Sequence, residues 1–145
     1  MDPEYTDKFL STVKAATITP QEPLVTLHAV YDAIIKGDFD GIGGFMTDDV
    51  ELNINGFVPL DGTWKGRREV IAASKKNFAQ VGSQQPVIEG MISQGDSVAV
   101  LMRESGVLQS TGQAYSIRGV QWFTFAGGKI RKIDQVTASI LKAAH

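Results

Sequence analysis

The sequence contains no cysteine and only two histidines, His28 and His145. Without cysteine there is no disulfide, no thiolate nucleophile and no sulfur ligand for a metal. The two histidines lie far apart in the chain, and neither is surrounded by other residues at metal-ligand spacing. We therefore expect no metal site, and no motif of the sequence indicates a cofactor.

The sequence also lacks a large net charge and a long apolar run. Its formal net charge of -2 provides no electrostatic attraction to nucleic acid or to an anionic membrane surface. No apolar stretch approaches the roughly 20 residues that span a bilayer. The acidic N-terminus, residues 1–8, lacks the basic start and apolar middle of a signal peptide. We expect a cytoplasmic protein that binds neither nucleic acid nor membrane.

The clearest pattern that is present is a hairpin over residues 115–137. Two runs rich in β-branched and aromatic residues flank the tripeptide Ala126-Gly127-Gly128. Its two glycines can supply the positive φ angles that a tight hairpin turn requires. The pattern predicts a long antiparallel hairpin near the C-terminus.

The N-terminal half is mainly helical in its periodicity. Residues 1–18 are typical of a short helix or a loose arm. Residues 19–145 are expected to form a single domain. The first long helix begins either at Thr19, which a capping pattern favours, or at Pro23, and it ends at Gly37. Four further elements are expected before the sheet: a short helix over 39–46, a strand over 50–55, a loop over 56–65 and a helix over 66–81.

The C-terminal half alternates between apolar and polar residues, as half-buried strands do. Four strands are expected, over 86–94, 96–109, 113–125 and 129–137. Helices followed by a run of strands predict an α+β fold with helices on one face of a mainly antiparallel sheet.

The order and spacing of four segments resemble the nuclear-transport-factor-like superfamily, and within it the SnoaL-like polyketide cyclases and ketosteroid isomerases. These segments are Val30–Asp38, Met46–Val50, Gly66-Arg67 and Val120–Ile130. The resemblance implies a cone-shaped α+β barrel in which a curved sheet wraps over a long N-terminal helix and encloses a blind apolar pocket. It also implies a homodimer formed through the outer face of the sheet, and proton transfer next to a carbonyl or epoxide.

The acid and base positions of those relatives hold other residues in this chain. The tyrosine donor and the aspartate base of ketosteroid isomerases align with Val30 and Ile54. A second acid of that family aligns with Gln121, and the last-strand acid of cyclase-like relatives aligns with Gln135. Tyr31 is one residue away from the donor position, but one helical step turns a side chain by about 100°. The family's mechanism therefore cannot be transferred to these four positions.

Two other carboxylates are candidate catalytic residues. Glu104 shares a strand face with Val98, Val100 and Met102. If that face lines the pocket, desolvation would raise the pKa of Glu104 and make it a relocated base; if a bulge shifts the register, Glu104 is a solvated charge. Asp134 is the second candidate, although the nearby cations Arg131 and Lys132 favour an exposed ion pair.

Several other residues are expected at the pocket. Gln121 is either a ligand hydrogen-bonding group or an amide satisfied by another strand. Gln135, which strand parity places with Ile133 and Thr137, is a candidate for a pocket role, and Trp64 is the candidate lid. Trp122 lies on the opposite face from Gln121 and is the expected dimer anchor. The remaining expected ligand contacts are Tyr31, Ile54, Phe57, Met102, Tyr115 and Phe123.

Two functions follow from these patterns. The first is a pocket protein that acts on a small, largely apolar cyclic compound by isomerase- or cyclase-like proton transfer. The alternative is a non-catalytic ligand-binding or scaffold module of the same fold, which the missing family acids favour. The two are distinguished by whether a carboxylate faces the pocket.

Overall fold

The computed structural model describes residues 21–141, and the expected arm over 1–18 lies outside this range. Within the described range, three α-helices and a single 3-10 turn accompany one six-stranded sheet. The helices are α2 (Gln21–Ile35), α3 (Phe39–Ile42) and α4 (Arg67–Ala79), and the 3-10 turn η1 covers Gly43–Phe45. The strands are β1 (Met46–Asn55), β2 (Gly62–Lys65), β3 (Val81–Gln94), β4 (Ser97–Leu108), β5 (Ala114–Ala126) and β6 (Lys129–Leu141).

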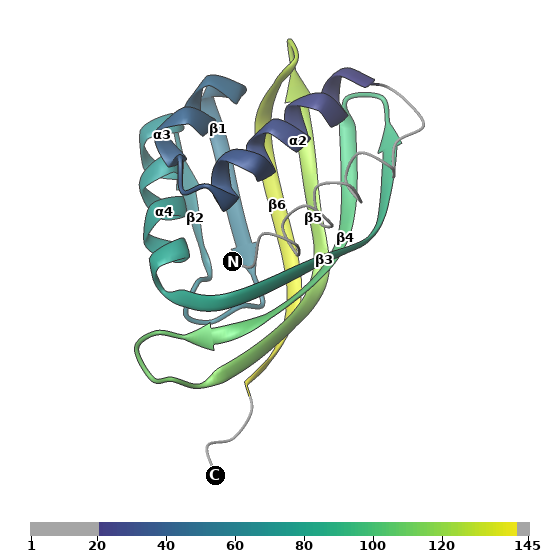
Figure 1. Cartoon of the computed structure of the whole chain (residues 1–145). Coiled ribbons are helices and arrows are strands. Elements are labelled where there is room, and N and C mark those ends of the chain that lie inside the picture. Colours follow the sequence, from purple (N-terminus) through teal and green to yellow (C-terminus); the bar gives the residue numbers. More distant parts are fainter. Residues whose placement is uncertain (1–20, 142–145) are drawn as a thin grey trace.

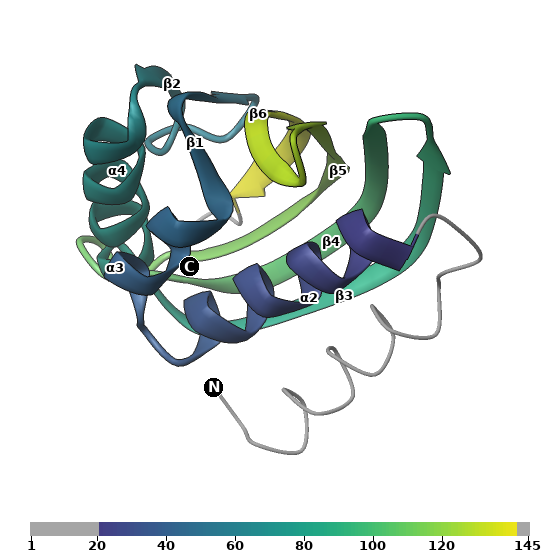
Figure 2. The ribbon, with the colours of Figure 1, turned by 90° about the horizontal axis from the view of Figure 1, so that it is seen from above.

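The strands lie in the order β2-β1-β6-β5-β4-β3. All neighbours are antiparallel except β1 and β6, which pair in parallel. The sheet curves strongly, and α2 crosses its concave side while α3 and α4 cover one end (Figures 1 and 2). This is the predicted α+β cone fold, with an open rather than a closed sheet.

The C-terminal hairpin forms as the sequence predicts. Gly127 and Gly128 have φ angles of 58° and 79°, which are the left-handed values of a tight hairpin turn. The pattern of burial along β5 alternates, so that Tyr115, Ile117 and Phe123 face the core. The hairpin therefore supplies one wall of the concave side.

Helix α2 ends where a glycine can adopt a positive φ angle. Gly37 has a φ of 75°, and its amide donates to Ile34 O while the Asp38 amide donates to Ala33 O. These two bonds satisfy carbonyls that the last helical turn would otherwise leave unpaired. Upstream, the helix continues through Pro23, so its described part begins before that residue.

Three expected boundaries before Gly66 were wrong, and β3 begins at Val81 rather than at residue 86. The short helix stops at Ile42, and Met46 already belongs to β1, so that strand begins before Val50 and includes Asp48 and Asp49. The loop expected over 56–65 ends in β2, which pairs with β1. In the cases before Gly66, the pairing of β1 with β6 or with β2 determines where the strand begins. This pairing overrides the local polar or glycine-rich composition.

The core lies between the concave face of the sheet and the helices. Its fully buried side chains come from every layer, among them Leu27 of α2, Val70 of α4 and Val100 of β4. No helix of the described residues is long and apolar enough to cross a membrane.

Candidate functional site

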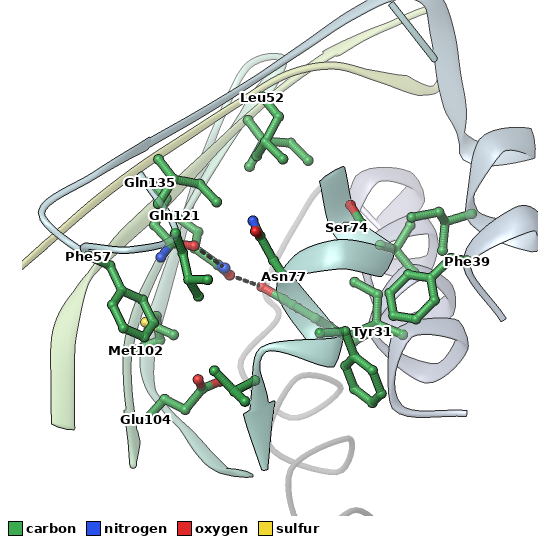
Figure 3. Close-up of a pocket in the computed structure, with 18 of the residues that line it drawn as sticks. Tyr31, Phe39, Leu52, Phe57, Ser74, Asn77, Met102, Glu104, Gln121 and Gln135 are labelled. Atoms are coloured by element: carbon green, nitrogen blue, oxygen red, sulfur yellow. Dashed lines mark hydrogen bonds between the residues drawn. The ribbon is translucent and has the colours of Figure 1, made fainter. Parts of the chain in front are cut away.

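A cavity of about 200 Å³ lies between α2, α4 and the concave face of the sheet. Most of its lining is apolar, and it draws residues from helices and strands that are far apart in the sequence (Figure 3). The polar residues that line it are Tyr31, Ser74, Asn77, Gln84, Glu104, Gln121 and Gln135. None of its described lining residues is a lysine, an arginine or a histidine.

Glu104 faces this cavity. Alternation along β4 places it on the same face as the buried residues Val100 and Met102, and the β4–β5 register pairs it with Ile117, which also lines the cavity. Among the described residues that line the cavity, Glu104 is the single carboxylate. Of the two interpretations of Glu104 left open by the sequence, the structure adopts the pocket-facing one.

Two neighbouring side chains hold the Glu104 carboxyl group. The Tyr115 hydroxyl donates a hydrogen bond of 2.6 Å to Glu104 Oε2. The Gln84 side chain interacts with both Glu104 and Tyr115. Gln84 reaches them at an irregularity of β3, where the β3–β4 register shifts between Gly82 and Gln85 and Ser83 has a φ of 50°. Such bulges redirect side chains, and this one directs Gln84 into the cavity.

The surroundings shift the ionisation of this group. Desolvation raises the pKa of Glu104 above its ordinary value, and the hydrogen bonds from Tyr115 and Gln84 oppose that effect. Burial, together with the adjacent Glu104 charge, raises the pKa of Tyr115, so the phenol stays protonated and remains a donor. A carboxyl group with a raised pKa in a cavity can accept and return a proton near neutral pH.

A second polar group lies on the same concave face. The Tyr31 hydroxyl donates to Gln121 Oε1 over 2.8 Å, and Gln121 Nε2 donates to Gln135 Oε1 over 3.0 Å (Figure 3). Burial raises the pKa of Tyr31, which keeps this phenol a donor. The amide of Gln121 is therefore bonded to a neighbouring strand, and the same side chain lines the cavity.

The positions that carry acids and donors in the family are on this cavity as well. Val30, Ile54, Gln121 and Gln135, which the resemblance aligns with those positions, all line it. Tyr31 lines it too, despite the helical step that separates it from the donor position. The cavity is wide enough around α2 for both Val30 and Tyr31 to reach it.

The structure brings most of the expected contact residues together. Phe57, Met102 and Phe123 line the cavity with the residues described above. Tyr115 lies behind this lining, where its ring packs on Phe57 at a centroid distance of 5.1 Å and its hydroxyl contacts Glu104.

Two expected site residues lie away from the cavity. Asp134 is on the outer face of β6, where it accepts a 2.8 Å hydrogen bond from Asn53 and lies 3.7 Å from Lys132 Nζ. Alternation explains this placement, because the adjacent Gln135 points inward. Trp64 lies on β2, where it pairs with Leu52 of β1. Its indole ring packs over Gly62 and does not line the cavity.

Sequence reasoning missed Gln84 and Asn77. The signal for Asn77 was available, because it adjoins Phe78 on the predicted helix, whereas Gln84 depends on a bulge that leaves no periodic mark. The described residues contain no cluster of three or more aspartate, glutamate or histidine side chains that could bind a metal.

A smaller cavity of about 120 Å³ adjoins the first. The two share the lining residues Tyr31, Ile34, Phe78, Gln84, Met102, Glu104 and Gln121. The smaller one extends between the end of α2 and β3, where Ile35, Pro86 and Ile88 line it. Glu104 with Gln84, and Tyr31 with Gln121, thus line both the larger cavity, here called the main chamber, and the smaller one, the side chamber.

Comparison with known proteins agrees with this architecture. Residues 27–133 match the family model of the SnoaL-like domain. An NTF2-like protein from Burkholderia xenovorans superimposes with a TM-score of 0.72 at 22% identity, covering 83% of this chain and 92% of the other. A candidate SnoaL-like polyketide cyclase from a Jannaschia species gives 0.72 at 20% identity, covering 83% and 90%.

A candidate isomerase from Rhodopseudomonas palustris gives a TM-score of 0.69 at 19% identity, covering 83% of this chain and 91% of the other. At these identities the structural likeness concerns the fold alone. No curated protein matches the chain. The family model nevertheless covers most of the sequence, and the chain belongs to the SnoaL-like family.

Proposed function

We propose that the chain binds a small, largely apolar cyclic compound in the main cavity and moves a proton on it. The observation that carries this proposal is Glu104, the one carboxylate among the described lining residues, with a raised pKa and two polar neighbours. Relatives described as a candidate isomerase and a candidate polyketide cyclase have the same fold, which is consistent with chemistry of this class.

In this mechanism, the ionised Glu104 takes a proton from a carbon next to a carbonyl group of the ligand. The electron pair of the broken C–H bond moves toward the carbonyl oxygen, and an amide N–H of the cavity donates a hydrogen bond to the developing oxyanion. Glu104 then returns the proton to the same carbon or to a conjugated one. Return to the conjugated carbon is an isomerisation, and no other reactant is consumed.

The test is solvent hydrogen exchange. Wild-type protein is incubated in D₂O with a panel of cyclic ketones, and incorporation of deuterium next to the carbonyl is followed by NMR. Replacement of a general base typically lowers such a rate by about 10²–10⁴-fold. We expect that loss in Glu104→Gln and none in Asp134→Asn, a matched control whose carboxylate lies on the outer face.

Two results would contradict the proposal. Wild-type rates in Glu104→Gln would show that this carboxylate is not the base. Ketone binding without exchange in the wild-type protein would favour the non-catalytic binding module instead.

We also propose that two copies of the chain associate through the outer face of the sheet. Three apolar side chains on β5, β6 and β3 are exposed there: Trp122 by 42%, Val136 by 62% and Ile92 by 73%. The register connects these positions across four strands, because Ile92 pairs with Ala99, Ala99 with Trp122, and Val136 with Val120, two residues from Trp122. Contiguous exposed apolar surface of this kind is typical of an association interface.

A further inference from the structure

We infer that the ligand is an uncharged compound of one or two rings whose acceptor oxygen binds at the Gln121–Gln135 pair. This inference deepens the proposed function, on which it rests, by naming the ligand's size, charge and orientation. Three observations carry it: the volume of the cavity, the charges of its lining and the direction of its hydrogen bonds.

The volume limits the size. An apolar cavity of about 150 Å³ holds a benzene ring, whereas sites for drug-sized ligands occupy about 300–1,000 Å³. The main chamber, at about 200 Å³, lies between the two. It therefore fits one ring or two fused rings, and the side chamber of about 120 Å³ can hold a short apolar substituent.

The lining limits the charge. A buried anion needs a cation or several donors to replace its hydration. No lysine, arginine or histidine is among the described residues that line either chamber, and Glu104 would repel a carboxylate or a phosphate. A cationic ligand would pair with Glu104 and lower the pKa of that group, but the apolar surroundings disfavour both charges. An uncharged ligand is the remaining class.

The amide pair sets the orientation. Tyr31 donates to the Gln121 carbonyl oxygen, and Gln121 donates to the Gln135 carbonyl oxygen. Each amide oxygen thus accepts one hydrogen bond within the pair or from Tyr31, while within residues 21–141 no group accepts a hydrogen bond from Gln135 Nε2. The pair consequently presents a donor to the cavity, and its complement is an accepting oxygen such as a ketone, lactone or ether.

Binding of four matched probes to the wild-type protein tests this inference, with dissociation constants measured by calorimetry. The probes are 1-tetralone, the parent hydrocarbon tetralin, tetralin-2-carboxylate and a four-ring steroid ketone. We expect 1-tetralone to bind about tenfold more tightly than each of the others. Equal or tighter binding of the carboxylate would overturn the assignment of charge, and tighter binding of the four-ring ketone would overturn the assignment of size.

Variants of the amide pair test the orientation. Gln135→Leu is expected to remove the preference for 1-tetralone over tetralin, and the milder Gln135→Asn to reduce it while the fold is kept. Retention of the full preference in both variants would contradict the assigned oxygen site. Failure of all four probes to bind would overturn the inference as a whole.

These results separate the inference from the proposed function. Selective binding of 1-tetralone with no hydrogen exchange would support the ligand class and contradict the chemistry. Exchange on a larger or charged ketone, removed by Glu104→Gln, would support the chemistry and contradict the ligand class.

Discussion

The Tyr115 hydroxyl lies 2.6 Å from Glu104 Oε2, and Gly106 makes this approach possible. Gly106 is the cross-strand partner of Tyr115, and a Cβ atom at that position would lie 2.7 Å from the Tyr115 hydroxyl oxygen. The absence of a side chain on β4 thus leaves room for the phenol that holds the candidate base on the same strand. Glycine here acts by leaving space, not by its backbone freedom.

Replacing Glu104 by glutamine should stabilise the protein at alkaline pH. The folded-state pKa of Glu104 is raised, so folding favours the protonated form, and that preference is lost as the pH rises through the raised pKa. Glu104→Gln removes the cost of a buried charge. We expect its melting temperature to exceed that of the wild type at pH 8, and the gain to vanish below about pH 4, where the carboxyl is protonated in both states.

The same pH series provides its own calibration, because each unit of pKa shift corresponds to about 1.4 kcal/mol. Glu89→Gln serves as the surface control, since Glu89 pairs with Arg118 on the outer face. A gain in Glu104→Gln that does not depend on pH would contradict a raised pKa.

Removing Gln84 should raise the pKa of Glu104 further. The Gln84 side chain favours the ionised form of this carboxyl, so Gln84→Met should move the pH midpoint of hydrogen exchange upward. The midpoint is measured from exchange rates, and the pKa independently by ¹³C NMR of the labelled Glu104 carboxyl. Gln85→Met is the matched control, because Gln85 is the next residue on β3 and is exposed. Equal midpoints in the two variants would show that Gln84 has no positioning role.

Tyr31→Phe should destabilise the fold and weaken ligand binding. It removes the hydroxyl that donates the 2.8 Å hydrogen bond to Gln121 Oε1, so this part-buried carbonyl oxygen loses that donor. Such a loss costs about 1–3 kcal/mol, measurable by urea unfolding. Val25→Ala, on the solvent side of the same helix, should change the free energy of unfolding by less than about 0.5 kcal/mol. An equally small effect of Tyr31→Phe would contradict a structural role of this bond.

Gly37→Ala should cost about 1 kcal/mol of stability. Gly37 has a φ of 75°, a value at which a Cβ atom is strained, and this conformation ends α2. Gly44→Ala is the matched control, because Gly44 has no positive φ and no atom within 4 Å of its added Cβ. Thermal unfolding of both variants tests the prediction, which fails if Gly37→Ala is as stable as Gly44→Ala.

Trp122→Arg should convert a dimer to monomers. A charge in the centre of the exposed outer patch opposes burial of that patch against a second copy. Sedimentation of the wild type and the variant gives their masses, and Val25→Arg on the helical side should leave the mass unchanged. A monomeric wild type, or a dimeric Trp122→Arg, would contradict the proposed interface.

Features that depend on neighbouring residues in the sequence were predictable. The hairpin turn at Gly127 and Gly128 and the end of α2 at Gly37 follow from local chemistry. Strict alternation also allowed the inward face of Glu104, but only as one of two alternatives between which the structure decides. The order of the elements was sufficient for the family resemblance. These are signals that a single strand or turn carries by itself.

Features that depend on pairing between distant segments were not predictable. Strand β2 forms because it pairs with β1, and the residues around Trp64 show no alternation that predicts a strand by itself. Gln84 enters the cavity through a β3 bulge, and a one-residue irregularity reverses the face that alternation predicts. Asp134 lies on the outer face, where it accepts a hydrogen bond from Asn53 of β1, a partner that the sequence of its own strand does not indicate.

The parallel pairing of β1 with β6 also determines the order in which the molecule can be completed. Leu52 pairs with Ile133, so the middle of the sheet joins segments separated by about 80 residues, and closing such a contact is slow. During synthesis, the first strand and the helices must wait until β6 has left the ribosome. The cavity is therefore among the last parts of the protein to form, and a nascent chain that ends before β6 lacks the wall that Ile133 and Gln135 supply.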